Sequence, residues 1–97
     1  MSNTVTTSTA VLTTANASRY LQQLCKHFAH KIPASFDTEK GKIDFPFGTC
    51  HLTAAGETLT LTAETAEPEM LERLEGVIAS HLERFAFREE LAINWTR

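Results

Sequence analysis

The chain has 97 residues, a formal net charge of −3 and 42% hydrophobic residues. This composition indicates one small domain with enough apolar material for a single core. The acidic balance argues against the basic surface that is typical of nucleic-acid-binding proteins, and it disfavours broad attraction to an anionic membrane. We therefore expect no nucleic-acid partner and no membrane partner.

The first fourteen residues do not have the composition of a targeting segment. Met1–Thr14 carries no charge, and its apolar run, Ala10–Leu12, is shorter than the core of a signal peptide. No apolar stretch approaches the length of a membrane-spanning helix. We expect a cytoplasmic protein in which residues 1–4 are flexible. Cys25 and Cys50 would then be free thiols, because a reducing compartment disfavours disulfides.

A strand and a helix are predicted in the first third of the chain. The segment Val5–Thr13 is rich in β-branched residues and predicts the strand. Asn16 is a favourable N-cap residue, and the helix is predicted to run from there to about Lys31. Pro33 ends the helix. Its apolar residues recur at helical spacing and form one stripe: Ala17, Leu21, Leu24, Phe28 and Ile32.

Three short strands joined by tight turns are predicted next. Apolar residues alternate in three runs: Ile43, Phe45 and Phe47; Cys50, Leu52 and Ala54; Leu59, Leu61 and Ala63. Such alternation predicts an antiparallel meander with one buried face. Pro46 has no N–H group to donate, so its strand is predicted to be an edge strand or to be bulged there.

A second helix and a last strand complete the predicted fold. The helix begins near Thr65 or Glu67, with Pro68 in its first turn, and ends near Phe85. Leu91, Ile93 and Trp95 alternate as the last strand. The sequence therefore predicts an α+β fold in the order β-α-β-β-β-α-β. An antiparallel sheet of four to five strands would carry both helices on one face.

His81 interrupts the apolar stripe of the second helix on its core side, between Ile78 and Phe85. A buried imidazole needs a hydrogen-bond partner. One interpretation is a structural histidine at the edge of the core. The other is a catalytic general acid or base that faces a cleft, with Arg84 holding an anionic substrate.

A metal site is a second hypothesis for the histidines. His27 and His30 are neighbours on the surface of the first helix, and strand alternation turns Cys50 toward the core. If the fold brought His27, His81 and Cys50 together, they would form a three-ligand site for a transition metal such as zinc or iron. The alternative is that the imidazoles are surface residues and the buried thiol is inert.

A ligand or partner surface is a third hypothesis. Arg84 and Arg88 are four residues apart at the end of the second helix, which suits recognition of an anion or of a partner protein. Tyr20, on the flank of the first helix, and Trp95 would provide flat walls for a ligand. The alternative is a solvated helix end. A homodimer is also compatible with the opposite charges of the two helices and with an edge at Pro46.

Three segments resemble a known family. They are Arg19–Lys31 (RYLQQLCKHFAHK), Gly48–Leu52 (GTCHL) and His81–Glu89 (HLERFAFRE), followed by Trp95. Together they resemble the bacterial domain-of-unknown-function family numbered twenty-two eighteen, over most of residues 18–97. The resemblance implies a small domain found beside siderophore-interacting flavin reductases, with such a reductase as partner and a role in iron handling. We therefore expect a binding or accessory module, with a small enzyme or a homodimeric subunit as alternatives.

Overall fold

The computed structural model describes residues 5–86, 88–89 and 91–97. The expected flexibility of residues 1–4 lies outside these described residues. The strands are β1 (Thr6–Thr13), β2 (Ala34–Phe36), β3 (Lys40–Phe45), β4 (Gly48–Ala55) and β5 (Thr58–Thr65). The helices are α1 (Ala17–Ala29) and α2 (Leu71–Phe85), and a short 3-10 turn, η1 (Pro68–Met70), precedes α2.

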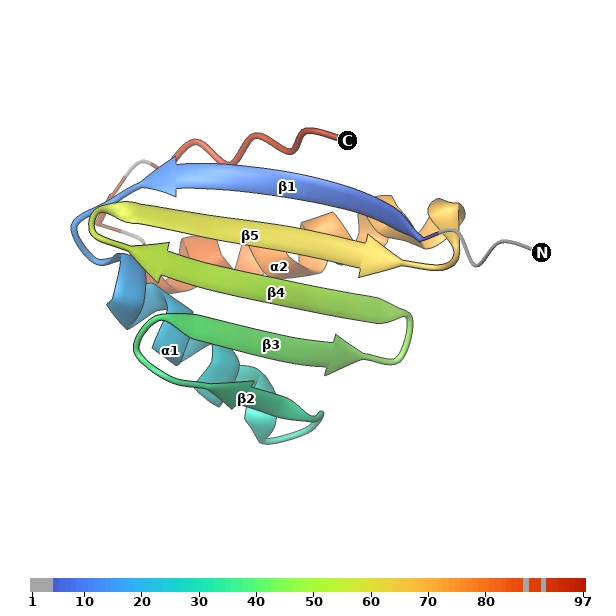
Figure 1. Cartoon of the computed structure of the whole chain (residues 1–97), viewed down its shortest axis with the longest axis horizontal. Coiled ribbons are helices and arrows are strands. Elements are labelled where there is room, and N and C mark those ends of the chain that lie inside the picture. The colour runs from blue at the N-terminus through green and yellow to red at the C-terminus, as the bar shows by residue number, and fades with distance from the viewer. Residues whose placement is uncertain (1–4, 87, 90) are drawn as a thin grey trace.

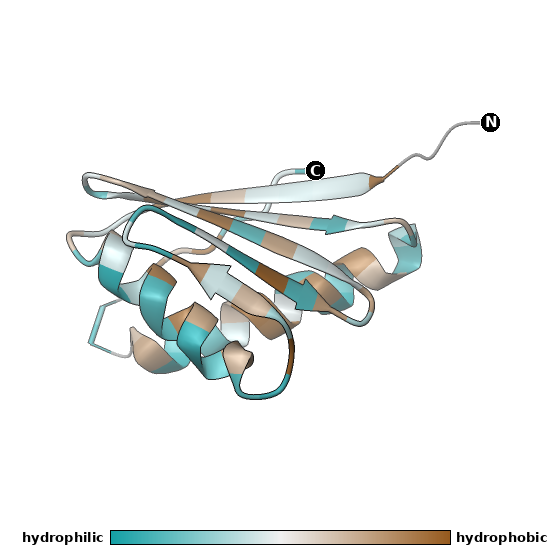
Figure 2. Ribbon diagram, turned by 60° about the horizontal axis from the view of Figure 1, so that its bottom comes forward, coloured by the Kyte–Doolittle hydropathy of each residue, from teal (hydrophilic) through white to brown (hydrophobic). Residues whose placement is uncertain are grey.

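The five strands form one antiparallel sheet in the order β1-β5-β4-β3-β2. Strands β2 to β5 follow one another as a meander, and β1 returns to pair with β5 (Figure 1). Both helices lie on the same side of the sheet (Figure 2), with α1 against β2, β3 and β4 and α2 mainly against β5 and β1. The structure confirms the predicted fold class, in which one sheet face carries both helices.

The core lies between this sheet face and the two helices. On β5 the residues Leu59, Leu61 and Ala63 are fully buried, whereas the threonines between them point to the opposite face. The helices add the apolar stripes that their spacing predicts; the fully buried leucines and isoleucine are Leu21 and Leu24 on α1 and Leu71, Leu74, Ile78 and Leu82 on α2. Each buried side chain of this size contributes roughly 1.5–3 kcal/mol, so the two stripes fix both helices on the sheet.

The strands differ from the predicted pattern in three details. Strand β2 has three residues and was not predicted. Strand β3 ends at Phe45, so Pro46 lies in the turn before β4 and removes no hydrogen bond from the sheet. The C-terminal segment keeps the predicted alternation of burial, but it joins β1 through one bridge, between Thr9 and Thr96, with hydrogen bonds of 2.8 and 2.9 Å. In Figure 1 it runs beside β1 along the edge of the sheet.

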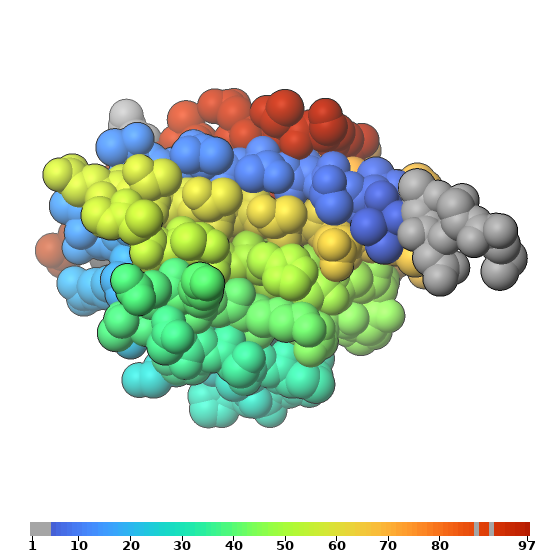
Figure 3. Space-filling model, viewed as in Figure 1, coloured from blue at the N-terminus to red at the C-terminus, as the bar shows by residue number. Residues whose placement is uncertain are grey.

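No described helix covers the other face of the sheet (Figure 3), where most of the residues that alternate with the core are polar and Val11 is exposed. One row across it consists of Thr9, Thr62, His51 and Lys42, on β1, β5, β4 and β3. His51 lies 3.6 Å from Glu64 on the neighbouring strand. This face therefore mixes threonine with both signs of charge. Among the described residues, no helix has both the length and the apolar composition needed to cross a bilayer.

Candidate functional site

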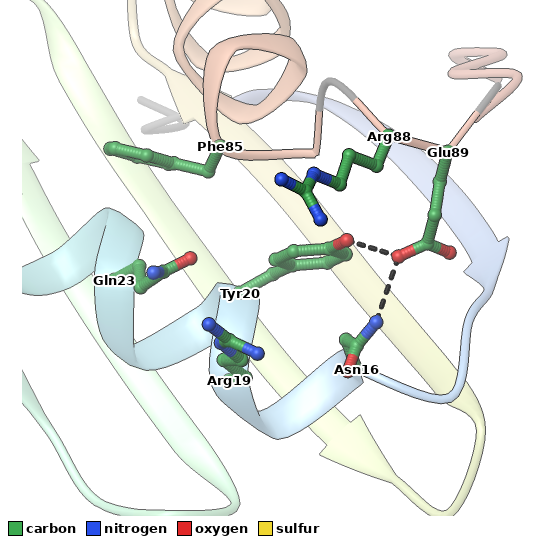
Figure 4. A pocket seen from close by; sticks show the side chains of 7 residues that line it. All are labelled: Asn16, Arg19, Tyr20, Gln23, Phe85, Arg88 and Glu89. Carbon is green, nitrogen blue, oxygen red and sulfur yellow. Dashed lines mark hydrogen bonds between the residues drawn. The ribbon is translucent and has the colours of Figure 1, made fainter.

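A pocket of about 450 Å³ opens where the first half of α1 meets the end of α2 (Figure 4). Its volume lies within the range of roughly 300–1,000 Å³ that is usual for small-molecule sites. Residues of α1 and of its N-cap form one wall, and the last residue of α2 and the segment after it form the other. The lining residues are Asn16, Arg19, Tyr20, Gln23, Phe85, Arg88 and Glu89.

The α1 wall follows from helical geometry. Residues three and four apart lie on the same side of a helix, so Asn16, Tyr20 and Gln23 share a flank beside the buried apolar stripe. Tyr20 belongs to both surfaces: its side chain is 6% exposed, and its hydroxyl group reaches the segment after α2. The half-buried ring of Phe85 lies on the α2 side. The pocket therefore has aromatic side chains on two of its sides.

The carboxylate of Glu89 closes one end of the pocket. The Tyr20 hydroxyl and the Asn16 amide, at 2.9 Å, both donate hydrogen bonds to its Oε2 atom (Figure 4). The Thr14 hydroxyl donates to its Oε1 atom at 2.9 Å. We call Thr14, Asn16, Tyr20 and Glu89 the Glu89 network. It joins the start of α1 to the segment that follows α2.

The Glu89 network sets the protonation of both its acidic members. Hydrogen bonds from Tyr20, Asn16 and Thr14 lower the pKa of the Glu89 carboxyl group. The same bond to Glu89, together with burial, raises the pKa of the Tyr20 phenol. At neutral pH the network therefore consists of a carboxylate and a protonated phenol, which is the arrangement that its hydrogen bonds require.

The pocket has a net positive charge, because its described lining contains two arginines and one carboxylate, Glu89. Arg19 and Arg88 are exposed residues of the lining, and in Figure 4 the Arg88 side chain extends from the segment after α2 toward Tyr20. Among the described lining residues the one carboxylate is Glu89, and both of its oxygen atoms already accept hydrogen bonds. Guanidinium groups bind carboxylate and phosphate with matched pairs of hydrogen bonds. The pocket is therefore suited to an anion.

The wall that α1 contributes also contains an unused acceptor. The Oε1 atom of Gln23 is buried and finds no hydrogen-bond partner among the described residues. Leaving a buried acceptor unsatisfied costs about 1–3 kcal/mol.

The two predicted metal-binding histidines lie side by side next to the pocket. The ring centroids of His27 and His81 are 5.0 Å apart. The ring of Phe28 packs against His81 at a centroid distance of 4.8 Å, and the ring of Phe85 packs against His27 at 5.7 Å. We call these four residues the histidine–aromatic cluster. Phe85 belongs both to this cluster and to the pocket lining.

His81 is half-buried at the edge of the core, as its interruption of the apolar stripe predicts. Its Nδ1 atom donates a hydrogen bond to the backbone carbonyl of Val77 at 2.7 Å. In the neutral ring this bond leaves the lone pair on Nε2. Burial lowers the pKa of the His27 imidazole, and the positive charge of the nearby Arg84 guanidinium lowers it further, so His27 is neutral at pH 7.

The structure does not bring Cys50 to these histidines as a third ligand. Within the described part of the chain, no group of three His, Cys, Asp or Glu side chains is placed to hold a metal ion. Cys50 is fully buried in the core, and burial raises the pKa of its thiol. Burial also raises the pKa of Cys25 to about 11. Both are therefore thiols at neutral pH, whereas a metal binds the thiolate.

The predicted ligand-binding residues are divided by the structure. Tyr20 and Arg88 both line the pocket, whereas Arg84 and Trp95 are not among its lining residues. Arg84 is exposed on α2 near His27, and Trp95 is half-buried against the core.

Five lining residues were not predicted as ligand contacts from the sequence: Asn16, Arg19, Gln23, Phe85 and Glu89. The polar flank at Asn16, Arg19 and Gln23 was a usable signal, because these residues share one side of the predicted helix. Glu89 had no local signal, since all its partners lie near the other end of the chain.

Comparison with known proteins agrees with this fold. The model of a family described as an uncharacterized protein conserved in bacteria, DUF2218, matches residues 9–96. The NMR structure of PA4090 from Pseudomonas aeruginosa is similar, with 34% sequence identity and a TM-score of 0.78. The match covers 93% of this chain and 94% of that one. A search of curated proteins gave no match.

Proposed function

For this chain, which belongs to the uncharacterised bacterial family DUF2218, we propose the function of a small binding module that holds an organic anion. The observation that carries the proposal is the pocket between α1 and the end of α2. It combines two arginines with aromatic walls, and its one described carboxylate is already satisfied. A ligand with a flat apolar part and a carboxylate or phosphate matches each of these features.

The pocket favours binding over catalysis. His81, the residue expected to act as general acid or base, is not among the lining residues. A general base must come within hydrogen-bond reach of the proton that it abstracts. The groups that do line the pocket are suited to recognising charge and shape.

Titration with benzoate tests the proposal, with benzamide as its uncharged isostere. We expect benzoate to shift the NMR signals of Tyr20, Gln23 and Phe85 saturably, and to bind at least about tenfold more tightly than benzamide. Replacing Arg19 or Arg88 by Gln should weaken benzoate binding by about tenfold, because each substitution removes a charge-assisted hydrogen bond of about 1.5–3 kcal/mol.

Arg73→Gln is the matched control. Arg73 lies over the ring of Phe47, with its guanidinium carbon 5.0 Å from the ring centroid, and it is not a lining residue. This variant should bind benzoate like the wild type. Equal binding of benzoate and benzamide, or equal loss in the Arg73 variant, would contradict a specific anion pocket.

We propose a ferric siderophore as one ligand of this kind, delivered to or received from a siderophore-interacting flavin reductase. The support is the resemblance described above and the positive, aromatic character of the pocket. A pocket of about 450 Å³ would take one aryl arm of such a chelate rather than the whole. The ferric chelate of 2,3-dihydroxybenzoate should therefore shift the same NMR signals as benzoate. Shifts elsewhere on the protein would reject this ligand.

A two-histidine metal site is a second candidate function. Its support is the 5.0 Å separation of the His27 and His81 rings, together with the His81–Val77 hydrogen bond, which directs the Nε2 lone pair away from the backbone. Zn²⁺ titration should then shift the imidazole signals of His27 and His81 before those of His30 and His51. Uniform shifts of all four histidines would remove this candidate.

The homodimer stays a prediction that light scattering can test.

A further inference from the structure

A second hollow lies beside the pocket, over the adjacent face of α1. It is more open than the pocket, has a volume of about 590 Å³, and shares Asn16, Arg19 and Gln23 with it. The remaining wall of this hollow includes Lys26, one turn further along α1, and Gly56 in the turn between β4 and β5. The two hollows therefore meet over one surface of α1.

The charges on this surface follow the two hollows. Arg88 belongs to the pocket, Lys26 belongs to the second hollow, and Arg19 lines both. The described lining of the second hollow contains no acidic residue. One cation therefore lies at each end of the two hollows and one lies in the middle, which suits a ligand with separated negative charges.

The neutral groups between these charges are not equally available. Gln22 donates a hydrogen bond to the Ser18 hydroxyl at 3.1 Å, and Ser18 donates to the Thr38 carbonyl at 2.6 Å. Gln23, on the shared wall, has its buried Oε1 atom without a partner among the described residues. That oxygen has no exposed surface, so the charged side chains are the groups that can bind a ligand here.

We propose that the ligand of this module is an elongated dianion that spans both hollows. Its flat apolar part and one anionic group occupy the pocket with Arg19 and Arg88. Its second anionic group lies over Lys26. This inference rests on the proposed anion-binding function and names the class of its ligand.

Two isosteric probes test the inference: N-benzoyl-glutamate and N-benzoyl-glutamine. Both carry a ring, an amide N–H and one carboxylate, and only the glutamate compound carries a second carboxylate. We expect the wild type to bind the glutamate compound about tenfold more tightly than the glutamine compound, because the second carboxylate adds one charge-assisted contact. Lys26→Met should abolish this difference and leave the affinity for the glutamine compound unchanged.

Lys31→Met is the control, because Lys31 is exposed just after α1 and lines neither hollow. It should leave the preference for the glutamate compound intact. Equal affinity of the two probes for the wild type overturns the inference, as does a Lys26→Met variant that keeps the preference. Failure of both probes while benzoate binds overturns the inference alone. Failure of benzoate as well overturns the proposed anion-binding function.

Discussion

The Glu89 carboxylate holds together parts of the chain that are 69 to 75 residues apart in sequence. Its donors are Thr14, Asn16 and Tyr20, and the last two also line the pocket. Asn16 was predicted to cap α1, and the helix does begin directly after it, but its amide bonds to Glu89 instead of to the helix. The shape of the pocket thus depends on one side chain from the segment after α2.

Replacing Glu89 by Gln should destabilise the protein in a pH-dependent way. The pKa of Glu89 is lower in the folded state. The stability that the ionised Glu89 carboxylate contributes is therefore present above its pKa in the unfolded state. It is lost as the pH falls through its pKa in the folded state. Urea denaturation should show the variant less stable than the wild type at pH 7. The difference should shrink in acid, below about pH 4, the ordinary range for glutamate.

Glu83→Gln is the control for this experiment, since Glu83 is exposed on α2 and belongs to no described ion pair. It should leave stability nearly unchanged at both pH values. A Glu89→Gln difference that is the same at pH 7 and in acid would show that shape, rather than the charge of the carboxylate, stabilises the network.

The sequence predicted some site residues and not others for a physical reason. The half-buried position of His81 follows from its place between Ile78 and Phe85 on its own helix. The meeting of Tyr20 with Arg88 required the packing of two helices, which periodicity alone does not define. The buried Gln23 Oε1 atom has no hydrogen-bond partner among the residues that the structure describes. A side chain's lack of a partner has no signature in local sequence.

Two glycines in different elements should respond to alanine with opposite signs. At Gly48, which begins β4, an added Cβ would lie 2.6 Å from the Glu64 carbonyl oxygen and 2.8 Å from the Leu74 side chain. At Gly76, inside α2, an added Cβ would meet nothing within 4 Å. Gly48→Ala should cost about 1–3 kcal/mol through overpacking, whereas Gly76→Ala should stabilise by about 0.5–1 kcal/mol through helix propensity.

Chemical denaturation of both variants checks this pair. The midpoints should move in opposite directions at similar slopes. A destabilised Gly76 variant would mean that the exposed face of α2 contacts something else in solution, which is the expectation for a homodimer through that helix.

At the level of elements, strong periodicity was the reliable signal. Helices α1 and α2 and strands β4 and β5 each contain several buried residues at regular spacing, and all four were predicted. Strand β3 was also predicted, from the alternation of Ile43 and Phe45, although only Ile43 is fully buried. Strand β2 was not, because three residues after Pro33 are too few to show alternation. The segment from Leu91 alternates correctly, but how far it pairs with β1 depends on that edge and not on its own sequence.

Across the whole molecule, protection should be greatest in the middle of the sheet. β5 pairs with β1 on one side and with β4 on the other, and its inward residues are buried. β2 is an edge strand of three residues, none of them fully buried. In native-state hydrogen exchange, β5 amides should exchange only through global unfolding, and β2 amides should exchange many times faster. Equal rates in β2 and β5 would contradict this order.

The position of β1 beside β5 has a consequence for the order of folding. β2, β3, β4 and β5 meet through short connections, so their ladders can close early at little entropic cost. β1 pairs Thr13 with Thr58 and Thr6 with Thr65, and each pair encloses about half of the chain. The pairing of β1 with β5 is therefore the slow step of folding, because it joins residues that are far apart in the sequence. Because α1 follows β1 directly, the pocket wall that α1 forms with Tyr20 and Gln23 would reach its final position only when β1 docks against β5, as the last strand to join the sheet.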